Sequence, residues 1–296
     1  VAIRRPNMAT ITDATKVFSV DAANGSDNPC FVSGFPVDFG LLKEYNATGS
    51  WQSSSRLTSG KALSTNATDA ESSNGIYSFA SNTSWLSAAL GSEYYSWMWK
   101  RAKGYFDIVA YAGNGTGNTE KHNLGAVPEM IWFKSRNSSG ADDWYTYHSG
   151  VGTSAYLELN DNASAESRSN WISLNNTQFT ADALVSQGST NYIAYLFATL
   201  AGVSKVGSVT HSGSSTDVDC GFSAGARFVL LKRTDATGDW FVWDSVRGII
   251  AGNDPYLLLN DAAAQVTNTD FIDPLSSGFQ ISGSFQDGDY IFYAIA

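Results

Sequence analysis

Two pairs of carboxylates are the residues in this sequence best suited to chemistry. They are Glu158 with Asp161, and Asp239 with Asp244. Glycosidases use two carboxyl groups that flank one glycosidic bond, so either pair could act as a polysaccharide depolymerase. In a strand, however, Glu158 and Asp161 would point to opposite faces. The sequence therefore favours exposed acidic residues on strands and turns, and predicts no catalytic residue and no enzyme.

Other reactive centres lack the local pattern that they need. No Gly-x-Ser-x-Gly elbow precedes a helix pattern, and Gly113-Asn114-Gly115 has the composition of a turn rather than of a phosphate loop. The three histidines have no spacing that resembles a metal-ligand set. The two cysteines, Cys30 and Cys220, are expected to be buried free thiols. We expect neither a metal nor a cofactor.

Aromatic residues give the strongest indication of ligand binding. Trp144 and Trp240 head alternating strand-like runs, and Tyr147, Trp243 and Asp244 follow them. If these side chains face water, they would stack on sugar rings as in a lectin. The alternative is that they pack in the core or between repeats. Both interpretations stay open at this stage.

Composition limits the possible partners. The 296 residues carry a formal net charge of -10, and only 16% of them are charged. An acidic surface repels phosphate backbones, so no nucleic-acid partner is expected. No apolar run approaches the ~20 residues of a membrane helix, so no membrane insertion is expected.

Self-comparison indicates three tandem copies of one unit, at 16–103, 104–201 and 202–296, of which the first is the most divergent. An apolar run that ends in lysine recurs, as do a Trp strand, a Leu-x-x-Asn element and a final aromatic strand. The three copies of these landmarks are Lys43, Lys134 and Lys232; Trp51, Trp144 and Trp240; Asn66, Asn160 and Asn260; and 94–99, 192–197 and 290–295. We interpret the lysines as edge charges that discourage aggregation.

Within each copy the runs are short, β-branched and aromatic, and Gly/Asn/Asp/Ser turns separate them. This pattern predicts an all-β fold of three tandem β-sandwich-like repeats, and the copy number suggests a pseudo-threefold arrangement. The Ala-rich stretch Asp261 to Gln265 is expected to form one or two helical turns. In the run 192–197, Tyr192, Ala194 and Leu196 would face one way and the other three residues the opposite way. Both faces are apolar, so we expect this strand to be covered on both sides, with contact between repeats.

The N-terminal stretch 1–15 precedes the first copy. It has Arg4 and Arg5 but no apolar h-region, so a signal peptide is not expected. Its polar, Thr-rich sequence suits strand addition to a neighbour, which would make it a docking arm for other proteins of an assembly.

Several motifs together are similar to a known family. They are the stretch from Gly104 to Tyr111 with Gly113-Asn114-Gly115-Thr116, His122 to Ile131 with Lys134, Phe228 to Asp235 through Gly238-Asp239-Trp240, Asp244-Ser245-Val246-Arg247-Gly248, and Tyr256 to Asn260. The sequence resembles the repeat domain of structural and tail-fibre-like proteins of marine tailed phages, including cyanophages. The resemblance is specific in copies two and three, and in copy one only Lys43 and Arg56 remain. It implies a virion role and brings no catalytic or receptor-binding residue.

We therefore expect a virion structural protein, either a tail-fibre or host-adhesion component or a head decoration protein. It would be made in the host cytoplasm without a signal peptide and would form an oligomer on the particle. A carbohydrate-binding module that recognises a host surface glycan is the alternative function, and a polysaccharide depolymerase is the third.

Overall fold

The computed structural model describes residues 10–25, 29–58, 60–73, 75–138 and 142–296. In this part of the chain the secondary structure is almost entirely antiparallel strand, arranged in five sheets. Two 3-10 turns, η1 (Ala14–Lys16) and η2 (Ala183–Val185), are the helical elements of the described residues. The all-β prediction is confirmed.

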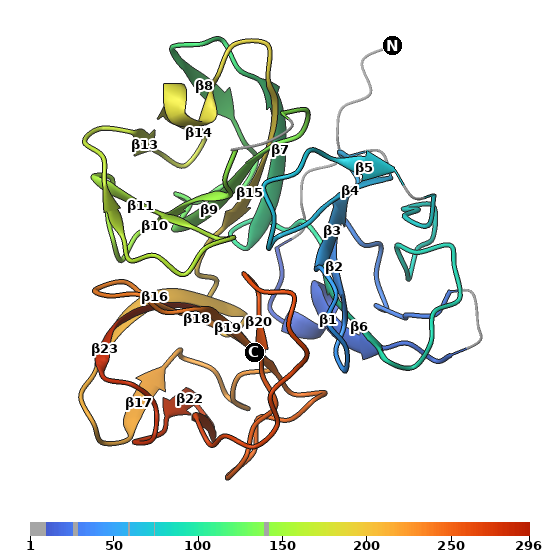
Figure 1. Ribbon diagram of the computed structural model, residues 1–296, viewed down its shortest axis with the longest axis vertical. Helices are drawn as coiled ribbons and strands as arrows, with labels where there is room; N and C mark the ends of the chain where they lie inside the picture. Colours follow the sequence, from blue (N-terminus) through green and yellow to red (C-terminus); the bar gives the residue numbers. More distant parts are fainter. Residues whose placement is uncertain (1–9, 26–28, 59, 74, 139–141) are drawn as a thin grey trace.

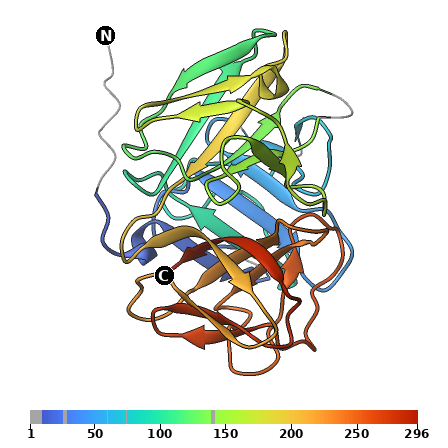
Figure 2. The ribbon, with the colours of Figure 1, turned by 90° about the vertical axis from the view of Figure 1, so that its left-hand side faces the viewer.

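No sheet crosses the boundaries predicted at residues 103/104 and 201/202 in the described residues. We call the stretches 16–103, 104–201 and 202–296 the first, second and third segments. Figure 1 shows one group of strands for each segment, placed around a common centre. The side view in Figure 2 has the second segment at the top and the third at the bottom.

The first segment forms one six-stranded sheet in the order β1-β6-β2-β3-β4-β5. Its strands are β1 (Phe18–Ala22), β2 (Phe39–Glu44), β3 (Gln52–Ser55), β4 (Lys61–Leu63), β5 (Ser72–Ser73) and β6 (Tyr94–Trp99).

The second segment forms a six-stranded sheet, β12-β11-β10-β9-β15-β7, and a three-stranded sheet, β13-β14-β8. Its strands are β7 (Phe106–Ala112), β8 (Gly117–Lys121), β9 (Met130–Ser135), β10 (Tyr145–His148), β11 (Ala155–Glu158), β12 (Glu166–Ser167), β13 (Ile172–Leu174), β14 (Gln178–Asp182) and β15 (Asn191–Phe197).

The third segment forms a five-stranded sheet, β16-β23-β18-β19-β20, and a three-stranded sheet, β17-β22-β21. Its strands are β16 (Ser204–His211), β17 (Thr216–Asp219), β18 (Phe228–Arg233), β19 (Trp240–Asp244), β20 (Leu257–Leu258), β21 (Ile272–Leu275), β22 (Gly278–Ile281) and β23 (Gly288–Ile295). In all three large sheets, the last strand of the segment lies between the first two strands of that sheet.

The final strand of each segment is covered on both faces, as predicted. In β15, Ile193, Tyr195 and Phe197 join a large core that contains buried residues of all three segments. Tyr192, Ala194 and Leu196 join a separate core within the second segment. The strand thus divides a shared central core from a core of its own segment, which places hydrophobic contact between the segments.

Aromatic rings fill the shared core and cross every boundary between segments. Phe39 of the first segment packs on Tyr195 of the second, with ring centroids 4.3 Å apart. Phe197 of the second packs on Tyr293 of the third at 5.1 Å, and Trp99 packs on Phe228 at 5.7 Å. Rings of this size dominate the energy of a core, so the segments depend on one another for burial.

The expected helical turns at Asp261 to Gln265 are wrong: this stretch has no helical structure. Its backbone is used in contacts with the first segment instead. The carbonyl of Ala262 accepts hydrogen bonds from the Gly49 amide at 2.8 Å and from Lys43 Nζ at 2.9 Å. A carbonyl engaged by another segment is not available for a helical ladder, so tertiary contacts outweigh the alanine propensity.

Candidate functional site

The three tryptophans of the recurring Trp strands are anchored within their own segments. Trp51, Trp144 and Trp240 are each at most 1% exposed. The backbone amide of each donates to the side-chain oxygen of the asparagine that ends the Leu-x-x-Asn element, namely Asn66, Asn160 and Asn260 at 3.0, 2.7 and 2.9 Å. This bond explains why Trp and Asn recur together in the sequence.

The indole nitrogens of the same tryptophans reach into other segments. Trp144 Nε1 donates to the carbonyl of Ser64 in the first segment, and Trp240 Nε1 to the carbonyl of Glu158 in the second, both at 2.8 Å. Trp51 Nε1 donates to the carbonyl of Leu258 in the third segment, also at 2.8 Å. The three bonds run in one cyclic order and close a ring.

The recurring lysines follow the same cyclic order, and their interpretation as edge charges is wrong. Lys43, Lys134 and Lys232 lie on the interior strands β2, β9 and β18 and are at most 1% exposed. Their ammonium groups donate to loop carbonyls, since a buried charge must find acceptors. Lys134 Nζ bonds Thr68 O of the first segment at 2.9 Å, and Lys232 Nζ bonds Ala163 O of the second at 2.7 Å.

Burial also changes the acid–base behaviour of these lysines. It lowers the pKa of Lys134 and of Lys232 to about 8, although nearby carboxylates oppose the shift. Burial lowers the pKa of Lys43 as well. The ammonium group of each lysine therefore joins two segments through a desolvated site rather than through a surface ion pair.

One backbone hydrogen bond adds to the contacts between each pair of segments. The Glu71 amide donates to Arg136 O at 2.8 Å, the Ala165 amide to Thr234 O at 3.0 Å, and the Gln265 amide to Tyr45 O at 2.7 Å. Each acceptor lies two positions after one of the buried lysines. Tryptophan, lysine and backbone thus form the same set of contacts three times, and we call these three sets the junctions.

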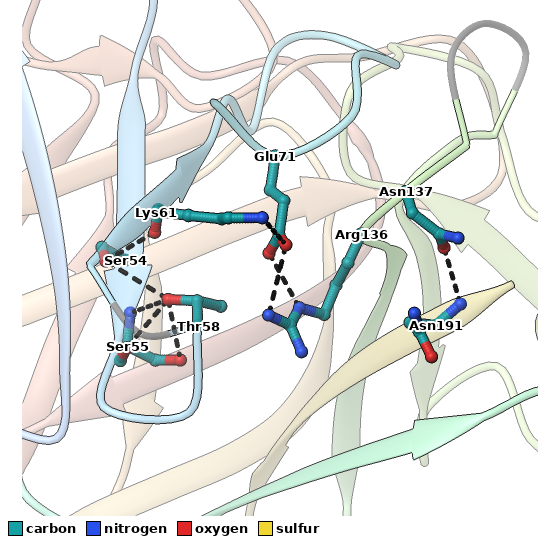
Figure 3. Close-up of polar contacts among 8 residues, drawn as sticks. All are labelled: Ser54, Ser55, Thr58, Lys61, Glu71, Arg136, Asn137 and Asn191. Carbon is teal, nitrogen blue, oxygen red and sulfur yellow. Dashed lines mark hydrogen bonds and ion pairs between the residues drawn. The ribbon is translucent and has the colours of Figure 1, made fainter. Parts of the chain in front are cut away.

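Figure 3 shows further polar contacts where the first and second segments meet. Glu71 lies between Lys61 of its own segment, at 2.9 Å, and Arg136 of the second segment, at 2.8 Å. Asn137 Oδ1 accepts from the Asn191 amide at 2.6 Å on the side of the second segment. The Glu71 carboxylate is only 10% exposed, so this pair is screened less than a surface salt bridge.

The ends of β10 and β19 hold buried polar groups that also cross between segments. His148 Nε2 lies 3.2 Å from Phe292 O of the third segment, and its Nδ1 accepts from the Gly150 amide at 3.0 Å. This pattern fixes a neutral imidazole, and burial lowers the pKa of His148 to about 4. Asp244 accepts from Arg247 at 2.6 Å and from Trp97 Nε1 of the first segment at 3.2 Å.

The five predicted ligand-binding residues are packed inside the protein. Trp144, Trp240, Trp243 and Asp244 are at most 1% exposed, and Tyr147 is 6% exposed. None of them offers an open ring face to a sugar in this structure. The structure supports the alternative interpretation for these residues, which is packing in the core and at the junctions.

Two of the candidate carboxylates, Asp239 and Asp161, accept hydrogen bonds from neighbouring residues. Asp239 Oδ1 accepts from Asn260 Nδ2 at 2.8 Å, and Asp161 Oδ1 accepts from the Ala163 amide at 2.7 Å. Burial, followed by the charges of nearby carboxylates, raises the pKa of Glu158 to about 7. The Glu158 backbone carbonyl is the acceptor of Trp240, so Glu158 belongs to a junction.

The described part of the chain contains no group of three or more His, Cys, Asp or Glu side chains suited to a metal ion. None of its helical elements has the length and hydropathy of a membrane span. Cys30 and Cys220 are buried free thiols, as expected.

Comparison with known proteins places the chain in a family. A family model described as a domain of unknown function (DUF7483) matches residues 14–296, so the chain belongs to this family. No curated protein matches the sequence. The family description assigns no activity.

Proposed function

We propose that this DUF7483 chain is a non-enzymatic structural protein of a tailed-phage particle, built from three tandem β repeats around a pseudo-threefold axis. It would act as a tail-fibre or host-adhesion component or as a head decoration protein. The observation that carries the proposal is the closed ring of equivalent junction bonds. Trp51, Trp144 and Trp240 each donate to the neighbouring segment in one cyclic order.

Strand order supports the repeat interpretation. In each large sheet the final strand pairs with both the first and the second strand of that sheet, as β15 does with β7 and β9. β23 does the same with β16 and β18, and β6 with β1 and β2. Three copies closed into a ring would resemble a trimer made from one chain.

The way in which polar groups are used supports a structural role. The buried lysines and tryptophans donate to backbone carbonyls of neighbouring segments, which are positions where they hold loops together rather than meet a substrate. Asp244, one of the candidate catalytic carboxylates, forms an ion pair with Arg247 in which both side chains are at most 1% exposed. The phage context rests on the motif resemblance described above.

The test is the position of the chain in purified particles of the phage that encodes it. We expect mass spectrometry to detect the chain in the particles. Cryo-electron microscopy should show one block of density with three lobes at a fixed site on the particle. Absence of the chain from purified particles would overturn the proposal.

The N-terminal arm is proposed to dock the block to other virion proteins. Most of this arm, residues 1–9, lies outside the described residues. Near the end of the arm, Asp13 Oδ1 accepts from the Thr15 amide at 2.9 Å. Deleting residues 1–10, which keeps Ile11 packed against the shared core, should remove the chain from particles, and the melting temperature of the variant serves as the control for folding. Unchanged incorporation would contradict the role of the arm and would leave the virion location intact.

A further inference from the structure

A hollow of about 380 Å³ opens beside the junction of the second and third segments. Its volume lies within the range of roughly 300–1,000 Å³ that is common for small-molecule sites. Phe241, Phe271, Phe285 and Tyr290 contribute aromatic rings to its lining, and Asn162, Arg233, Asp239 and Gln286 contribute polar groups. The hollow therefore combines aromatic faces with donors and acceptors, unlike a purely apolar groove.

Ring packing against neighbouring side chains holds the aromatic lining residues in place. Phe241 stacks on buried Trp243, with centroids 5.4 Å apart and planes 13° from parallel. Phe271 stacks on Tyr256 at 5.6 Å and 24°, and meets Phe285 edge-on at 5.0 Å. Phe241 and Phe271 are only partly buried, so these fixed rings still present surface to the hollow.

Hydrogen bonds also hold the polar lining residues in place. Arg233 is oriented by two bonds to Asp235, at 2.7 and 3.1 Å. Asp239 is oriented by Asn260 Nδ2 at 2.8 Å, through one of its two oxygens. Asn162 comes from the second segment, and its loop is fixed because its carbonyl accepts from the Gly238 amide at 2.9 Å.

We propose that this hollow is a binding site for a pyranose ring of a neutral glycan. A sugar needs an aromatic face for its apolar C–H side and groups of both hydrogen-bonding kinds for its hydroxyls, and the hollow supplies both. A fully apolar ligand would leave Asn162, Asp239 and Gln286 without partners. An anionic ligand would meet the Asp239 carboxylate, and the cation of the lining, Arg233, is already paired with Asp235.

The site differs from the predicted lectin residues, which are buried, and does not depend on the virion location. Tyr145 is the counterpart of Phe241 in the second segment, because β10 pairs with β11 at Tyr145 as β19 pairs with β20 at Phe241. Tyr145 lies opposite Glu158, whereas Phe241 lies opposite Leu258. Tyr145 therefore offers a matched aromatic control at a place where the neighbouring residue is acidic.

The test uses the whole purified chain, a glycan array and saturation-transfer NMR with a panel of methyl pyranosides. We expect at least one pyranoside to bind, with affinity lowered about tenfold, or 1.4 kcal/mol, by Phe271→Ala and by Asn162→Ala. Tyr145→Ala should leave this affinity unchanged. If Phe271→Ala fails to fold, Asn162→Ala and Gln286→Ala decide, because both side chains are exposed.

Absence of binding from both the array and the panel would overturn the proposal. So would binding that Asn162→Ala and Gln286→Ala leave intact, because the glycan would then sit elsewhere. These outcomes are independent of particle imaging: glycan binding by a chain that is absent from particles would overturn the virion role alone.

Discussion

The indole of Trp144 donates a 2.8 Å hydrogen bond to the backbone carbonyl of Ser64, 80 positions earlier in the chain. This bond joins the second segment to the first, and Trp240 makes the equivalent bond from the third segment to the second. The stability of one segment should therefore depend on the presence of its neighbours.

Replacing Trp240 with Phe should destabilise the whole chain. The change removes the bond to Glu158 O and part of a fully buried ring, so we expect a loss of about 2–4 kcal/mol in the free energy of unfolding. Hydrogen exchange should rise in all three segments together, because we expect segments that share one core to unfold as one cooperative block.

The control for Trp240→Phe is Trp171→Phe, whose indole donates to Ala155 O within its own segment at 2.9 Å. Trp171→Phe should lower the free energy of unfolding by a similar amount. A rise in exchange confined to residues 202–296 in Trp240→Phe would show that the third segment unfolds independently.

Truncation after Ala201 should leave a destabilised and aggregating fragment. Removing the third segment uncovers Phe18, Trp99 and Phe197, which pack on Phe228 and Tyr293 in the intact chain. Large exposed apolar patches promote association. Light scattering and thermal melting test this; a monomeric fragment that melts at the temperature of the full chain would identify the segments as independent units.

Chemical labelling should distinguish the junction lysines from surface lysines. Lys134 and Lys232 are fully buried, while Lys103 and Lys121 are exposed. Brief reductive methylation of the native chain should modify the exposed pair and spare the buried pair, although burial lowers the pKa of the latter to about 8. Mass spectrometry gives the site occupancies, with the urea-unfolded chain as control. Equal labelling of all four lysines in the native chain would contradict their burial.

The sequence predicted more of the strands than of their contacts. The run 192–197 is apolar on both faces, which was sufficient to predict that both faces are covered, because a continuous apolar run is typical of a fully buried strand. The burial of Lys134 could not be deduced, since its acceptors are the backbone carbonyls of Thr68, in another segment, and of Asp142, in its own, and carbonyl positions leave no mark in residue type. The only available signal was its recurrence with Lys43 and Lys232.

The aromatic hollow was missed for a related reason. Phe271 and Phe285 lie in loops rather than in alternating runs, so no periodicity marks them, whereas the tryptophans that head the strand-like runs are buried. The helical turns expected at 261–265 failed because the Ala262 carbonyl is held by Lys43 and Gly49, again a contact between segments.

Acid should destabilise the contact that His148 makes between the second and third segments. Burial holds the folded-state pKa at about 4 against an ordinary value of 6.5. Between these values the unfolded chain binds a proton that the folded chain does not, so stability falls as pH drops from 6.5 towards 4 and this contribution then levels off. The expected slope is about 1.4 kcal/mol per pH unit for one proton.

His148→Gln isolates this effect, because the amide can still donate to Phe292 O but does not titrate. Glu158 and Asp254, whose pKa values are raised to about 7, act with the opposite sign and are present in both proteins. The difference in urea-unfolding free energy between wild type and variant should therefore change between pH 6.5 and 5. Parallel pH profiles for the two proteins would rule out His148 as the source.

Gly40 should tolerate no side chain, because Trp85 packs directly on the β2 backbone. A Cβ at Gly40 would lie 2.3 Å from Trp85 Cε2, far inside contact distance. Trp85 cannot move aside freely, since it is fully buried, stacks on Tyr77 at 5.4 Å and donates to Ser96 Oγ at 2.9 Å. We expect Gly40→Ala to lower the free energy of unfolding by about 3 kcal/mol.

The matched control for Gly40→Ala is Gly49→Ala, where the nearest atom to an added Cβ is 3.9 Å away; it should change stability by less than about 1 kcal/mol. Replacing the indole with a smaller side chain in the double variant Gly40→Ala/Trp85→Leu should restore part of the stability that Gly40→Ala removes, because the clash disappears with the indole. Urea unfolding of the wild type, Gly40→Ala, Trp85→Leu and the double variant gives the coupling energy between positions 40 and 85. If the two substitutions are instead additive, the close approach of Trp85 to β2 is not what requires glycine at position 40.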